Sequence, residues 1–154
     1  MVIREAGILF RGYTVVKKSY HKTTLGKIDS DLRSGLLTAL INFAETAFSM
    51  NHVEYFEGKK FIIAFTNHEI TAEDAIEPEL LIAYAIIDKE KKVDKYLHKI
   101  VSPSLNHVAE EFIARNNKKN LSEVSQFKYF KNLLDETFGS DTKSIDQKLE
   151  GLFY

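Results

Sequence analysis

The chain has no cysteine, no tryptophan and only two prolines among its 154 residues. The absence of cysteine excludes disulfides, zinc–thiolate sites and thiol nucleophiles, and it fits a reducing, cytoplasmic setting. Because 21 basic residues face 22 acidic ones, no single-sign field is present to hold nucleic acid. No apolar run approaches the ~20 residues of a membrane span. We therefore expect one cytoplasmic domain with its own core.

Motifs that mark enzymes are also missing. The glycine–lysine pair Gly26-Lys27 lacks the glycine that a Walker A loop needs five residues earlier, and no G-x-G-x-x-G occurs. The five histidines have no i, i+4 pair and are predicted to be surface or boundary residues: His21, His52, His68, His98 and His107. We expect no enzyme, metal or cofactor. A site assembled across elements would need two of these histidines to converge with a carboxylate.

Five segments have the pattern of β-strands: residues 2–10, 13–20, 53–56, 60–66 and 80–87. The first two are joined at Arg11-Gly12 and predict a hairpin, and Gly7 predicts a bulge or a closely packed neighbour. The last two are continuously apolar, which is typical of strands covered on both faces. We therefore expect helices on both sides of the sheet, and a solvated acidic loop over residues 67–79.

The strongest helical pattern lies between the hairpin and the third strand, over residues 32–48. Its apolar arc is wider than one sheet face requires. The adjoining flank is small and uncharged: Ser34, Gly35, Thr38, Ala39, Asn42 and Thr46. A glycine inside a helix costs about 1 kcal/mol relative to alanine, so Gly35 indicates close packing. The flank either packs under a strand of the same chain or forms a partner interface that satisfies Thr38 and Asn42.

Two more helical patterns follow the last strand. The first runs from residue 91 to residue 113 and is interrupted at Pro103, where we expect a kink rather than a restart. Its apolar stripe, predicted to face the core, is Val93, Leu97, Ile100, Val101, Leu105, Val108, Phe112 and Ile113. The second runs from residue 122 to residue 138 and ends at Gly139, and its apolar residues are Val124, Phe127, Phe130, Leu133, Leu134 and Phe138. Residues 141–154 are predicted to be a tail or short helix that docks weakly or on a partner. The domain is thus expected to span residues 1–140.

The order β-β-α-β-β-β-α-α resembles the longin domain of the longin/roadblock superfamily over about residues 2–138. The stretches that carry the resemblance are residues 31–44 after the hairpin, the strand at 61–65, the strand ending at 85–88 and the helix ending at 111–113. Roadblock domains begin with a helix before the hairpin, so the initial strand here favours longin. The resemblance implies an α+β, profilin-like fold with a five-stranded antiparallel sheet, the first helix on one face and the later helices on the other.

The same resemblance implies a function without catalytic residues. Such domains form homodimers or heterodimers, often bind a small Ras-like GTPase, and act in regulatory or trafficking complexes. Our leading hypothesis is therefore a cytoplasmic interaction module whose partner or dimer interface is the small-residue flank. The alternative is a roadblock/PAS-like small-molecule sensor, in which Phe65, Tyr84 and Phe112 line a pocket.

Overall fold

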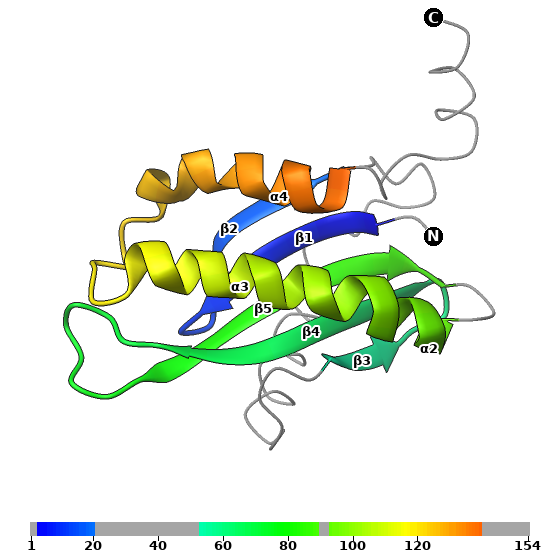
Figure 1. The fold of residues 1–154 in the computed structure, drawn as a ribbon, viewed down its shortest axis with the longest axis horizontal. Coiled ribbons are helices and arrows are strands. Elements are labelled where there is room, and N and C mark those ends of the chain that lie inside the picture. The colour runs from blue at the N-terminus through cyan, green and yellow to red at the C-terminus, as the bar shows by residue number, and fades with distance from the viewer. Residues whose placement is uncertain (1–2, 21–52, 90–92, 140–154) are drawn as a thin grey trace, which may run out of the picture.

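The computed structural model describes residues 3–20, 53–89 and 93–139 (Figure 1). Its strands are β1 (Ile3–Phe10), β2 (Tyr13–Ser19), β3 (Val53–Glu57), β4 (Phe61–Ile70) and β5 (Glu79–Asp88). Its helices are α2 (Val93–Tyr96), the π-helical turn η1 (Leu97–Val101), α3 (Ser102–Asn116), the 3₁₀ helix η2 (Val124–Phe130) and α4 (Lys131–Phe138). The strand–helix order predicted for these residues is confirmed.

The five strands form one antiparallel sheet in the order β2-β1-β5-β4-β3. The hairpin turns at Arg11 and Gly12, whose φ angles of 50° and 81° are both positive, as in the tight turns that match the twist of paired strands. β5 lies at the centre between β1 and β4, as its continuous apolar sequence requires.

The loop between β4 and β5 is shorter than predicted. β4 continues past residue 66, because Asn67 pairs with Ile82 and Ile70 pairs with Glu79 in register. The connection is therefore residues 71–78, and the polar side chains of Asn67 and His68 are buried in the sheet. Pairing along the whole length of β5 outweighs the low strand propensity of these residues.

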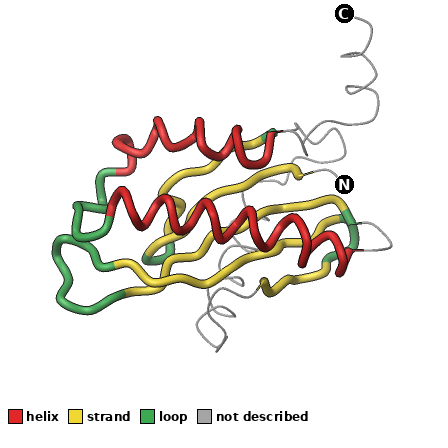
Figure 2. Tube along the Cα trace, in the orientation of Figure 1, coloured by secondary structure: helices red, strands yellow, loops and turns green. Residues whose placement is uncertain are grey.

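All described helices lie on one face of the sheet, which we name the helix-covered face. α3 packs against β4 and β5, and α4 packs against β1 and β2 (Figures 1 and 2). Three alanines, Ala6, Ala85 and Ala64, are paired in one row across β1, β5 and β4 on this face. Such small side chains allow a helix to approach the sheet closely.

The opposite face of the sheet is also apolar and buried. Its residues are at most 3% exposed: Leu9, Ile63, Phe65, Ile82, Tyr84 and Ile86. The prediction that β4 and β5 are covered on both faces is thus confirmed. The helix predicted over residues 32–48 lies outside the described residues, so its position on the opposite face remains a prediction.

The helix that contains Pro103 accommodates it through a wider turn. The Ser102 N–H bonds to the Leu97 carbonyl within η1, five residues back, and the backbone stays helical into α3. Proline removes one helical N–H and collides with the preceding turn, and the π-helical turn supplies the space. The wider turn rotates the residues before Pro103 relative to those after it. As a result Ile100, predicted to be buried, is 40% exposed.

The last predicted helix forms as η2 followed by α4. Most of its predicted apolar side chains are buried on the helix-covered face: Phe127, Phe130, Leu133, Leu134 and Phe138. Val124 is the exception and is 43% exposed. Residues 141–154, predicted to be a tail or short helix, lie outside the described residues.

Gly7 permits a close contact on the opposite face, as predicted. Tyr84 pairs with Gly7 across the sheet, and its hydroxyl donates to Glu5 Oε2 at 2.6 Å. A Cβ on Gly7 would lie 2.6 Å from the Val16 carbonyl oxygen and 2.8 Å from the Tyr84 hydroxyl oxygen. A register shift between Ile3 and Glu5 turns Glu5 toward this face.

Replacement of Gly7 by alanine is expected to destabilise the fold by about 1–3 kcal/mol, because the contacted carbonyl is backbone and cannot move freely. Gly139→Ala is the matched control, since a Cβ there would meet no described atom within 4 Å. Urea unfolding of both variants measures the difference. Equal free energies of unfolding would contradict the close contact.

Candidate functional site

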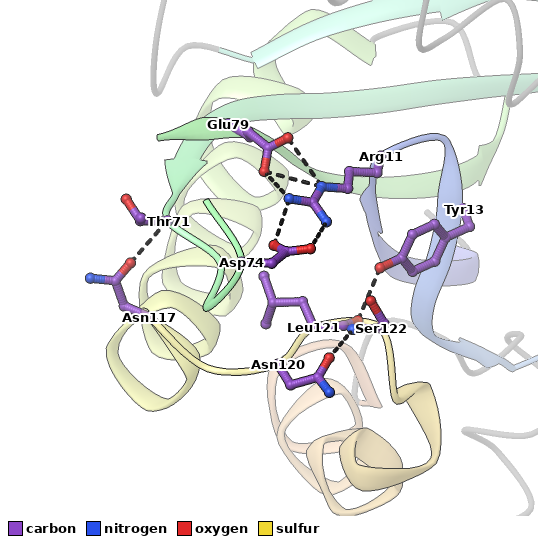
Figure 3. A network of polar contacts seen from close by, with 9 residues as sticks. All are labelled: Arg11, Tyr13, Thr71, Asp74, Glu79, Asn117, Asn120, Leu121 and Ser122. Atoms are coloured by element: carbon purple, nitrogen blue, oxygen red, sulfur yellow. Dashed lines mark hydrogen bonds and ion pairs between the residues drawn. The ribbon is translucent and has the colours of Figure 1, made fainter. Parts of the chain in front are cut away.

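The predicted interface lies entirely outside the described residues. None of Ser34, Gly35, Thr38, Ala39, Asn42 and Thr46 is placed, so the flank remains a prediction from sequence. Within the described residues, polar side chains gather where the β1–β2 turn, the loop 71–78 and the connection 117–123 meet. We name this region the hairpin pole (Figure 3).

Arg11 is the centre of the hairpin pole. Its guanidinium donates to Asp74 through Nη1 and Nη2 at 3.0 and 2.9 Å, and to Glu79 through Nε and Nη2 at distances down to 2.6 Å (Figure 3). The guanidinium lowers the pKa of Asp74 below its usual value, and the two carboxylates raise the pKa of Arg11. Two acids predicted to be solvated are therefore paired.

The loop 71–78 is also tied to the connection that follows α3. Lys118 N–H donates to the Thr71 carbonyl, and Glu73 N–H donates to the Lys119 carbonyl at 2.9 Å. The Asn117 side chain accepts from Thr71 N–H at 3.0 Å (Figure 3). Three segments distant in sequence are thus held in one arrangement, which reduces the entropy lost on binding a partner.

The hydroxyl of Tyr13 completes these contacts from β2. It donates to the carbonyl of buried Leu121 at 3.0 Å (Figure 3). The sequence alone predicts Arg11 only as a turn residue. The sequence does contain an arginine in a hairpin turn and an acidic loop elsewhere in the chain. Only the strand order shows that the two lie next to each other.

An exposed isoleucine and a cavity occur at the hairpin pole. Ile76, in the tied loop, is 99% exposed. A surface cavity of about 430 Å³ is lined by Leu9, Phe10, Arg11, Gly12, Glu79, Leu80 and Ile82. These lining residues include no serine, threonine, lysine or histidine, and their one carboxylate, Glu79, is ion-paired with Arg11. They combine apolar contact with one ion pair, an arrangement suited to binding.

One histidine does not lie where the sequence predicted. His68 is 5% exposed on β4, and its Nε2 lies 2.9 Å from Thr66 Oγ1. Burial lowers its pKa, although Glu110 and Asn106 act in the opposite direction. His98 and His107 are exposed. In residues 3–20, 53–89 and 93–139, no group of three or more histidines and acids is arranged to hold a metal ion.

The aromatic residues predicted for a sensor pocket do not lie together. Phe65 and Tyr84 are buried on the opposite face. Phe112 is on the helix-covered face, with ring centroids 5.0 Å from Phe127 and 5.2 Å from Phe130. Phe65 and Tyr84 are paired across β4 and β5, but the sheet separates them from Phe112, so the three cannot line one pocket.

Comparison with protein-family models, with curated proteins and with solved structures found no match. Among the described helices, none has the length and apolar character needed to cross a membrane.

Replacement of Arg11 by glutamine is expected to loosen the loop 71–78, because both carboxylates lose their cation. The amides of Glu73 and Lys118 should exchange hydrogen several-fold faster, while amides of β5 keep their protection. Lys89→Gln, which removes an exposed ion pair of 3.5 Å with Glu57, is the control. Unchanged exchange at Glu73 and Lys118 would contradict the role given to Arg11.

Proposed function

We propose that this chain is a non-enzymatic, longin-like interaction module that dimerises and binds a small Ras-like GTPase or a regulatory complex. The observation that carries the proposal is the five-stranded antiparallel sheet followed by two helical segments that cover one face. This is the architecture that the sequence resemblance implies for the described residues.

The character of the opposite face supports the same proposal. Its buried apolar residues need a cover, and the helix predicted over residues 32–48 has an apolar arc suited to it. A helix seated in this way turns its small-residue flank away from the centre of the sheet. Thr38 and Asn42 would then be available to a second domain rather than to the core.

A second candidate function is a small-molecule sensor, and the cavity at the hairpin pole favours it. Its volume of about 430 Å³ falls within the range of small-molecule sites. The ligand would be mainly apolar with one polar group able to contact Arg11 or Glu79. None of Phe65, Tyr84 and Phe112 lines this cavity.

Replacement of Asn42 by arginine is expected to abolish dimerisation and partner binding, because a long charged side chain would separate two closely packed surfaces. Asn132→Arg, at an exposed position of α4, makes the same chemical change elsewhere. The mass in solution and the proteins captured from the native cytoplasm are compared for the three chains.

A dimer or a captured GTPase that persists in Asn42→Arg would contradict the proposed interface. Wild-type protein that is monomeric and captures no partner would contradict the interaction module itself. In that case, a small molecule that copurifies with the chain and is lost in Arg11→Gln would support the sensor.

A further inference from the structure

A groove runs along the free edge of the sheet, distant in sequence from the predicted interface. Its volume is about 400 Å³, and it lies between β2 and η2. The lining residues are Thr14, Val15, Val16, Lys17, Val124, Ser125, Phe127, Lys128 and Lys131. Because β2 is the last strand in the sheet order, no described strand pairs with its outer side.

The groove has an apolar floor. Val16 and Phe127 belong to the core of the helix-covered face and form its inner surface. Val124 is 43% exposed at its wall. The groove therefore offers an apolar surface made of one exposed valine beside buried core side chains.

The rim of the groove is basic. Lys17, Lys128 and Lys131 are exposed, and none of them forms an ion pair with another described residue. The neighbouring Lys18 differs, because its Nζ lies 3.4 Å from Asp135. Three positive charges that no carboxylate of the described residues pairs with therefore surround an apolar floor, in a chain whose formal net charge is −1. A groove with an apolar floor and a positively charged rim favours an acidic ligand.

The geometry of β2 disfavours a second copy of the same edge. Ile8 pairs with Val16 and Leu9 pairs with Thr14, so Val15 is an extra, bulged residue. Bulges and lysines on an edge strand oppose its extension by a further strand. Two copies joined by this edge would also bring like-charged lysines together. The groove thus fits a short segment of another protein better than its own copy.

We propose that the groove between β2 and η2 binds a short acidic segment of a partner protein that carries an apolar anchor. The anchor packs on Val16, Val124 and Phe127, and the flanking carboxylates contact Lys17, Lys128 and Lys131. This proposal rests on the described residues alone, and its failure would leave the predicted interface at residues 34–46 untouched.

The probe is a short fluorescent peptide in which glutamate alternates with leucine, added to the full chain and followed by anisotropy at low and high salt. A peptide of alternating glutamine and leucine removes the charge, and one of glutamate and serine removes the anchor. Both should bind at least several-fold more weakly, and binding of the first peptide should weaken with salt. Absence of binding, or equal binding of all three, would overturn the proposal.

The variant Lys128→Glu should weaken binding of the first peptide by roughly tenfold, because it replaces attraction by repulsion at the rim. Lys59→Glu, exposed in the β3–β4 turn, is the matched control with the same change in net charge. Val124→Ser should weaken binding without changing its salt dependence. Equal affinity of Lys128→Glu and Lys59→Glu would overturn the proposed site.

The same experiments test two other possible occupants of the groove, a second copy of the chain and the chain's own C-terminal segment. Self-association of the wild-type chain that Lys128→Glu abolishes would assign the groove to a second copy and overturn the proposal. Stronger peptide binding by Leu149→Ser, a change in the stretch 141–154 that leaves the net charge unaltered, would assign the groove to the chain's own C-terminal segment and overturn the proposal as well.

Discussion

The double burial of β5 is the constraint on which the rest of the structure depends. β5 pairs with β1 and β4 over nearly its whole length, and its side chains are buried on both faces. Burial of a large aliphatic or aromatic side chain contributes about 1.5–3 kcal/mol relative to exposure. Two layers must therefore cover the sheet. The described helices supply one of these layers. On the helix-covered face of the sheet, the row of three alanines allows α3 to pack closely.

The second layer determines what kind of protein this is. If the helix predicted over residues 32–48 covers the opposite face, the chain has the three-layer arrangement that the longin resemblance implies, and the small-residue flank remains available to a partner. The hairpin pole and the β2–η2 groove are separate surfaces. The hairpin pole is held by ion pairs and backbone hydrogen bonds, and the groove by the packing of η2 on β2, so neither proposed binding surface would first need to become ordered.

The sequence predicted the parts of the fold that depend on local periodicity. All five strands and both later helical segments were found because their apolar residues recur at the spacing of strands or helices. The predicted end of β4 was wrong, because pairing with β5 extends this strand through Asn67 and His68 despite their low strand propensity. Ile100 was misplaced because a π-helical turn before Pro103 shifts the helical phase.

The candidate sites were harder to predict than the fold, because they depend on strand order. Arg11 meets Asp74 and Glu79 across more than sixty positions of sequence, and no local pattern links them. The groove beside β2 exists only because β2 is an edge strand and η2 packs along it. The flank at residues 34–46 follows from a local pattern and stays a prediction, and no local pattern identifies its partner.

The most direct test of the account is a measurement of nuclear Overhauser effects between methyl groups in the full chain. The account predicts contacts between Ile63 or Ile86, on the opposite face of the sheet, and Leu36 or Leu40, in the predicted helix. Such contacts would establish the second layer and orient the small-residue flank. Their absence, with Ile63 and Ile86 in contact with other segments instead, would contradict the three-layer fold and the interface derived from it.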